Sequence, residues 1–153
     1  MKVRWRVTGG TAALVALAVL GAGPASAAAP SSVAGGTPSW SSSQLKASGS
    51  FKNNASTSAT YSDTLQLVRT STASKPSCTT AGGCLTSGTT QLLLNKVTSS
   101  VSVPKSATVK LPVLSVNCSA SSTTRYYWSW LKVADASGNV VTSISSYIAG
   151  KYC

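Results

Sequence analysis

Residues 124–147 read TRYYWSWLKVADASGNVVTSISSY, and this stretch decides the fold. Its first half is rich in aromatic and β-branched residues, which favour strands. A short polar segment follows, in which Gly138 supplies the positive φ that a tight hairpin turn requires. A second β-branched run begins at Val140. The stretch therefore predicts an antiparallel hairpin of two strands, 124–134 and 140–147.

The chain between residue 44 and this hairpin is built in the same way. Short apolar and β-branched runs are separated by small polar residues, and no apolar stripe keeps a helical spacing for three turns. The chain is therefore expected to be all-β. The predicted strands are 44–52, 57–62, 64–70, 90–97, 99–103, 107–116, 124–134 and 140–147.

Alternation within these runs assigns side chains to faces. Three runs show it: Leu65 and Leu67 around Gln66, Val101 and Val103 around Ser102, and Val109, Leu111 and Val113 around Lys110 and Pro112. One wet face per strand is typical of a small antiparallel β-sandwich, immunoglobulin-like or jelly-roll-like, with a Greek-key barrel as the alternative. Because Pro112 has no amide hydrogen, the 107–116 run is expected to be peripheral or broken in two.

The N-terminus has the pattern of a secretory signal peptide. Three basic residues precede the apolar run 12–20, and Ala25-Ser26-Ala27 provides small residues for cleavage. A membrane anchor is the competing interpretation, but the run is shorter than the roughly 20 residues that span a bilayer. We expect cleavage after residue 27, a secreted, extracellular product and no integral membrane segment in it. The Ala-, Ser- and Thr-rich composition resembles that of small secreted bacterial proteins, those of actinomycetes in particular.

The mature chain divides into an arm and a domain. Residues 28–43 consist of Ala, Pro, Ser, Gly and Thr, with Val33 and Trp40 as the large apolar exceptions. Such a stretch buries too little apolar surface to offset its ordering entropy. We therefore expect a flexible arm at 28–43 and a single β-sandwich domain at 44–153, with Trp40 either packed on the domain or free for a partner.

Four cysteines in a small exported domain indicate two disulfides. Three pairings are possible, and we favour Cys78–Cys84 with Cys118–Cys153. The first closes a short loop, and the second ties down the last residue. The second disulfide is expected to stabilise the fold more, because it closes the longer loop and so restricts the unfolded chain more. A zinc site is disfavoured because the spacing lacks paired Cys-x-x-Cys motifs.

The parts for catalysis are scarce. The chain has no His and no Glu, and Asp63 and Asp135 are its two carboxylate side chains. Acid–base catalysis and metal binding normally need more of these groups. Ser43 and Lys46 have the spacing of a Ser-x-x-Lys motif, which is weak evidence by itself. We expect no enzyme, no cofactor and no metal.

The segment around the two central tryptophans contains most of the candidate partner-binding residues. As a strand it places Tyr126, Trp128 and Trp130 on one face, with Tyr127 and Leu131 on the other. The tryptophan face is either the core or an exposed platform for stacking on sugars or bases. Together with the arm tryptophan, the candidate partner-binding residues are Trp40, Arg125, Tyr127, Trp128, Trp130 and Lys132.

The mature chain is strongly basic. Residues 28–153 hold ten Lys and Arg against two Asp, a formal charge of +8. This charge favours polyanionic partners. The cations are spread singly along the chain, however, and cations spaced in this way can also serve only to keep the surface soluble. No motif typical of nucleic-acid binding is present, so nucleic acid is not expected as a partner.

These features favour a secreted, non-catalytic binding protein. The leading hypothesis is an accessory or linking subunit that docks to protein partners in an exported, toxin-like complex. The arm would add a strand to a partner's sheet, with Trp40 as an anchor. The alternative hypothesis is a cationic antibacterial module that binds the cell envelope or its carbohydrate.

Overall fold

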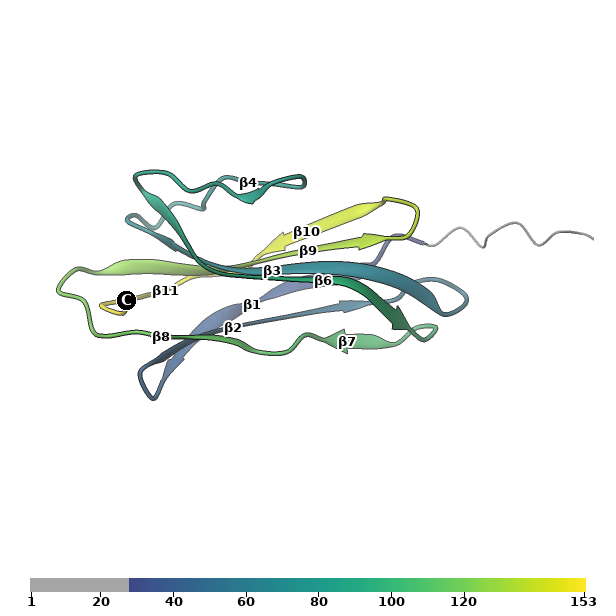
Figure 1. The fold of residues 1–153 in the computed structure, drawn as a ribbon, viewed down its shortest axis with the longest axis horizontal. Coiled ribbons are helices and arrows are strands. Elements are labelled where there is room, and N and C mark those ends of the chain that lie inside the picture. The colour runs from purple at the N-terminus through teal and green to yellow at the C-terminus, as the bar shows by residue number, and fades with distance from the viewer. Residues whose placement is uncertain (1–27) are drawn as a thin grey trace, which may run out of the picture.

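The computed structural model describes residues 28–153, which are antiparallel strands joined by turns and loops (Figure 1). This part of the chain contains no helix, and so no helix of the length and hydropathy that a membrane span requires. The prediction of an all-β fold is confirmed. The strands are β1 (Ser31–Ser41), β2 (Gln44–Lys52), β3 (Ala59–Thr70), β4 (Cys78–Thr79), β5 (Gly83–Cys84), β6 (Thr90–Val103), β7 (Thr108–Lys110), β8 (Leu114–Asn117), β9 (Arg125–Asp135), β10 (Val140–Ile144) and β11 (Ile148–Gly150).

The strands form two main sheets and one small hairpin. Sheet A has the order β1-β2-β7, and β8 also pairs with β2. Sheet B has the order β10-β9-β3-β6, and β11 also pairs with β9. β4 and β5 pair with each other and lie on the side of sheet B that faces away from sheet A (Figure 1). The molecule is thus a sandwich with a hairpin lid.

The predicted hairpin forms the end of sheet B. β9 and β10 pair from Val140 opposite Ala134 to Ile144 opposite Trp130, and Gly138 has a φ of 86° in the turn. The second strand stops at residue 144, three residues before the predicted end. The chain then bends and pairs again with β9 as β11, so the two short strands share one long neighbour.

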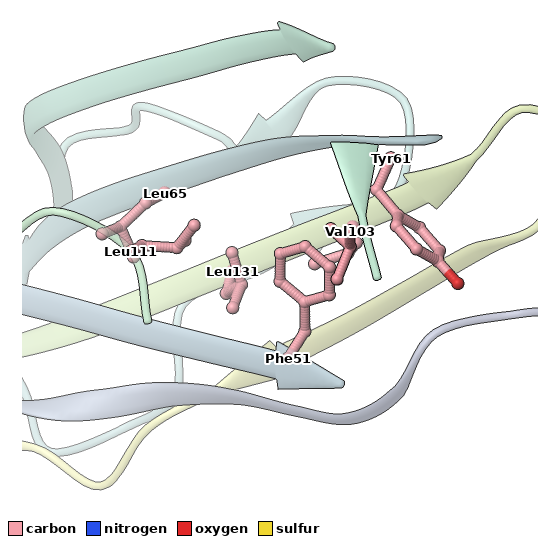
Figure 2. Close-up of a cluster of buried hydrophobic side chains, with 7 residues drawn as sticks. Phe51, Tyr61, Leu65, Val103, Leu111 and Leu131 are labelled. Atoms are coloured by element: carbon pink, nitrogen blue, oxygen red, sulfur yellow. The ribbon is translucent and has the colours of Figure 1, made fainter. Parts of the chain in front are cut away.

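The core lies between the sheets and draws on both. Figure 2 shows Phe51 of sheet A pointing toward sheet B, where Leu131 and Tyr61 meet it. Phe51 and Leu131 are fully buried, and the rings of Phe51 and Tyr61 pack edge to face with centroids 5.4 Å apart. The predicted orientation of Leu65 and Leu67 into the core is confirmed, with exposed fractions of 2% and 0%.

Residues 28–43 are not the flexible arm that composition suggests. Residues 31–41 form β1, paired with β2 along its length, so the folded unit begins before residue 44. Main-chain pairing with β2 holds this segment in place although its side chains bury little apolar surface. The small residues contribute as well: a Cβ on Gly35 would lie 2.7 Å from the main-chain oxygen of Ser129 on β9. Glycine at this position lets the two sheets approach closely.

Other strand boundaries differ from the prediction in instructive ways. The runs 57–62 and 64–70 are one strand, β3, and 90–97 and 99–103 are one strand, β6. The register between β3 and β6 shifts between Tyr61 and Asp63, so a bulge stands where a break was expected. The predicted break at Pro112 is confirmed, since it separates β7 from β8. Because alternation does not persist across that break, Val113 is 59% exposed instead of facing the core.

Both predicted disulfides are confirmed. Cys78 bonds to Cys84 and Cys118 bonds to Cys153. The first closes the β4–β5 hairpin. The second joins the segment after β8 to the last residue and thereby links sheet A to the part of the chain that follows sheet B.

Candidate functional site

The aromatic segment runs along β9, a central strand of sheet B, and both of its faces are covered. Tyr127 points into the space between the sheets and is fully buried. Trp128 and Trp130 point to the opposite face and are each 3% exposed. The predicted exposed tryptophan platform is therefore wrong. The alternative, that the tryptophans are the core face, is also incomplete, because Trp130 belongs to a separate, smaller cluster and Trp128 packs against Tyr147.

The β4–β5 hairpin covers Trp130, whereas Trp128 packs against the ring of Tyr147, with ring centroids 5.0 Å apart. Trp130 packs with Val68 and Cys84 beneath the hairpin. The main-chain N–H of Cys84 donates a 2.9 Å hydrogen bond to Oε1 of Gln66 on β3, and this anchors the lid to the sheet. Trp128 donates from Nε1 to Oγ1 of a threonine at the end of β3, 3.0 Å away. The outer face of sheet B is dry here, contrary to the expectation of one wet face per strand.

Trp40 also packs on the fold. Its ring stacks on that of Tyr152 with centroids 4.4 Å apart and planes 12° apart. Tyr152 in turn lies 5.7 Å from the ring of Tyr127, whose hydroxyl donates to the main-chain oxygen of Tyr152. Trp40 is therefore packed on the domain and not free for a partner, and its side chain is half-buried.

The two basic candidates are half-buried and lie toward opposite ends of β9. Arg125 is opposite Gly150 of β11, whereas Lys132 is opposite Thr142 of β10. The structure thus does not unite the six predicted partner-binding residues in one site. Arg125 instead lines a cavity with Arg69, the last but one residue of β3.

Both carboxylates of the described chain are withdrawn from the surface. Asp63 and Asp135 are 4% and 6% exposed. Burial raises the pKa of Asp63, against smaller opposing effects of a hydrogen bond from Thr98 and the charge of Lys96. Burial also raises the pKa of Asp135, but hydrogen bonds from Asn139 and from main-chain N–H groups of the turn outweigh it, and the net pKa is lowered.

The lysines of sheet A form a surface that sequence reasoning missed. Alternate residues of β2 are buried, so the positions between them, including Lys46 and Lys52, point outward. Lys110 on β7 lies opposite Ser50 and shares this side. We call Lys46, Lys52 and Lys110 the lysine face. The alternation of 44–52 indicates that Lys46 and Lys52 share one face. Only the pairing of β2 with β7 shows that Lys110 lies on the same face.

Small residues predominate beside one of these lysines, with Leu111 and Val113 as the larger exceptions. A groove of about 310 Å³ runs beside Lys110. It is lined by Ala34, Gly36, Ser48, Gly49, Ser50, Thr108, Lys110, Leu111 and Val113. An extended ligand on this side could approach the main chain of sheet A closely. Within residues 28–153 no cluster of three potential metal-ligating side chains accompanies it.

Comparison with known protein families finds no match, and comparison with curated proteins finds none either.

Proposed function

We propose that this chain is a secreted, non-catalytic protein that binds an anionic polymer of the cell envelope through the lysine face. The charge distribution carries the proposal. Each of the ten Lys and Arg residues in 28–153 is exposed or half-buried, while both carboxylates are buried. A surface with cations and almost no exposed acid attracts polyanions and has little to repel them.

The lysine face supports this role better than other parts of the surface. Lys46 and Lys52 are six residues apart on one strand, so their Cα atoms are separated by about 20 Å. Lys110 stands between them on the neighbouring strand, opposite Ser50. A row of cations, with a groove of mostly small residues beside Lys110, is suited to a linear polymer with repeated negative charge.

Two further features support export. The two disulfides are typical of proteins that fold in an oxidising compartment. The predicted signal peptide, residues 1–27, lies outside the residues that the structure describes, so this part of the proposal rests on the sequence pattern.

A triple substitution tests the proposal. Lys46, Lys52 and Lys110 are changed together to Gln, and binding to a purified glycerol-phosphate polymer is measured across salt concentrations. An exposed charge contact contributes up to about 1 kcal/mol, so losing three of them weakens binding by about 2 kcal/mol, or about 30-fold. Binding of the unmodified protein is expected to fall steeply as salt rises.

The matched control is a second triple, Lys75, Lys105 and Lys151 to Gln, which removes the same charge from exposed loop positions. We expect this triple to lose less than about threefold, by long-range attraction alone. Equal losses in the two triples would refute the lysine face as the site. Absence of polymer binding by the unmodified protein would refute the function itself.

The second candidate is an accessory or linking subunit that docks to a protein partner. It no longer draws support from a free arm or an exposed tryptophan platform, since β1 is paired and the tryptophans are buried. The observation in its favour is β6, a long strand at the edge of sheet B with Val97 62% exposed. An unpaired edge can accept a partner strand. Stoichiometric, salt-insensitive co-elution with one protein from native culture medium would favour this candidate.

A further inference from the structure

A cavity of about 310 Å³ opens at the end of the sandwich where β3 ends and β9 begins. Arg69 and Arg125 contribute its cationic side chains. The loop before β6 lines another side with Thr86, Ser87 and Thr89, and the hydroxyls of the last two are 3.3 Å apart and hydrogen-bonded. None of the residues that line it carries a carboxylate or an aromatic ring.

The Arg69 guanidinium is held in place. Its Nη1 donates to the main-chain oxygen of Cys153, and its Nη2 donates to Oε1 of Gln91. These contacts use part of the five N–H donors of a guanidinium and leave the others for a ligand. Because its position is fixed by the fold, little ordering entropy remains to be lost when a ligand binds.

The two charges have no carboxylate side chain to balance them. Asp63 and Asp135 are the acids of residues 28–153, and neither lines the cavity. Within residues 28–153, neither Arg69 nor Arg125 forms an ion pair with an acidic side chain. The charge of Lys96 acts on Asp63, and Asp135 accepts hydrogen bonds within its own turn. A small cavity with two guanidinium groups and no acidic side chain in its lining is suited to an oxyanion.

We propose that this cavity binds a phosphate group carried by a small polyol. The guanidinium groups match the charge and planar hydrogen-bond geometry of phosphate. The hydroxyl rim is suited to hydrogen bonds with the hydroxyls of the polyol. The lack of an aromatic ring removes the stacking that recognition of a nucleobase or a sugar ring normally uses. The volume is at the lower end of small-molecule sites, which suits a ligand of a few carbons.

This site is separate from the lysine face and does not depend on the proposed function. Its ligand can be a free phosphorylated polyol, which is a phosphomonoester, or one unit of a polymer, which is a phosphodiester, since both place anionic phosphate oxygens beside polyol hydroxyls. The test therefore uses glycerol 3-phosphate, glycerol, inorganic phosphate and a glycerol-phosphate polymer as separate probes, with binding measured by calorimetry and by NMR shifts of the cavity residues.

The informative variant is Arg125→Gln, because Arg69 also contacts Cys153 and its loss would disturb the fold. We expect one molecule of glycerol 3-phosphate to bind per chain, and Arg125→Gln to weaken it at least about tenfold. The control is Lys132→Gln, which removes one charge from the same strand away from the cavity and is expected to leave binding within about twofold. Arg125→Lys keeps the charge but loses the planar guanidinium that can donate two parallel hydrogen bonds. The affinity of this variant for glycerol 3-phosphate is therefore expected to lie between those of the unmodified protein and Arg125→Gln.

Glycerol is expected not to bind, and inorganic phosphate is expected to bind more weakly than glycerol 3-phosphate. Equal affinities for the two phosphates would overturn the polyol part of the proposal. Equal losses in Arg125→Gln and Lys132→Gln, or no shift of cavity residues with any probe, would overturn the site. The triple substitution of the lysine face is expected to leave glycerol 3-phosphate binding unchanged. The cavity can therefore be tested independently of polymer binding at the lysine face. Binding of the polymer alone at the cavity would identify a polymer unit as the ligand, and binding of glycerol 3-phosphate alone would identify the free phosphorylated polyol.

Discussion

Asn53 is the residue whose replacement we expect to be most damaging among the polar side chains. It follows β2, is fully buried and connects three segments of the chain. Its Nδ2 lies within 3.0 Å of three main-chain oxygens, and its Oδ1 accepts from a main-chain N–H and from a tyrosine hydroxyl. The partners are Thr57, Val103 and Pro104 on the donor side and Ala55 and Tyr61 on the acceptor side.

The substitution Asn53→Ala removes all of these interactions. The amide has two hydrogens, so at most two of the three donor contacts are full hydrogen bonds at one time, which leaves about four bonds in total. At about 1 kcal/mol each, the free energy of unfolding falls by about 4 kcal/mol. For a domain of this size that corresponds to a decrease in Tm of about 15 °C.

Denaturant and thermal unfolding, followed by tryptophan fluorescence, measure this effect. Asn54→Ala is the matched control, because the neighbouring Asn54 is exposed, and we expect a change within about 0.5 kcal/mol. Tyr61→Phe removes one of the bonds and should cost about 1 kcal/mol. Similar stabilities for Asn53→Ala and Asn54→Ala would refute the reasoning.

Three other predictions concern the packing, the pH response and the cross-links. Gly35→Ala should lower the free energy of unfolding by about 2 kcal/mol, because the new Cβ meets main chain at 2.7 Å, while Gly88→Ala, with open space around it, should not; a chemical unfolding series compares them. The lowered pKa of Asp135 contributes stability above the carboxyl's ordinary pKa and loses it as pH falls through the folded value, so Asp135→Asn should cost more at about pH 6 than at about pH 3. A flat difference across that range would contradict this sign. Replacing Cys118 and Cys153 by Ser opens a loop with a sequence separation of 35 residues and should cost about 4 kcal/mol, measurable as a lower Tm under non-reducing conditions.

Features set by local chemistry could be read from the sequence. The turn at Gly138 followed from its freedom to adopt positive φ, and the break at Pro112 from its missing amide hydrogen. The burial of Leu65 and Leu67 followed from alternation, although Gln66 between them is buried as well. Each of these depends on a residue and its near neighbours along the chain.

The candidate sites could be predicted only in part. The sequence identified Arg125 as a candidate but not its neighbour in the cavity, Arg69, since the two come from different strands. The interpretation of the tryptophans as an exposed platform, one of the two considered, is wrong because both are buried. Nothing in the alternation of β9 indicates that a disulfide-closed hairpin covers Trp130 from outside.

The sequence by itself determined that this chain forms antiparallel strands and where its clearest hairpin turns, because strand periodicity and backbone freedom act over short distances. It favoured the observed cysteine pairing but left two others open, and the structure decided among the three. Only the tertiary structure decided that β1 joins sheet A, that β4–β5 covers Trp130, and that scattered cations gather into a face and a cavity. Those outcomes depend on main-chain pairing and close packing between segments far apart in the chain, which leave no periodic mark in either segment alone.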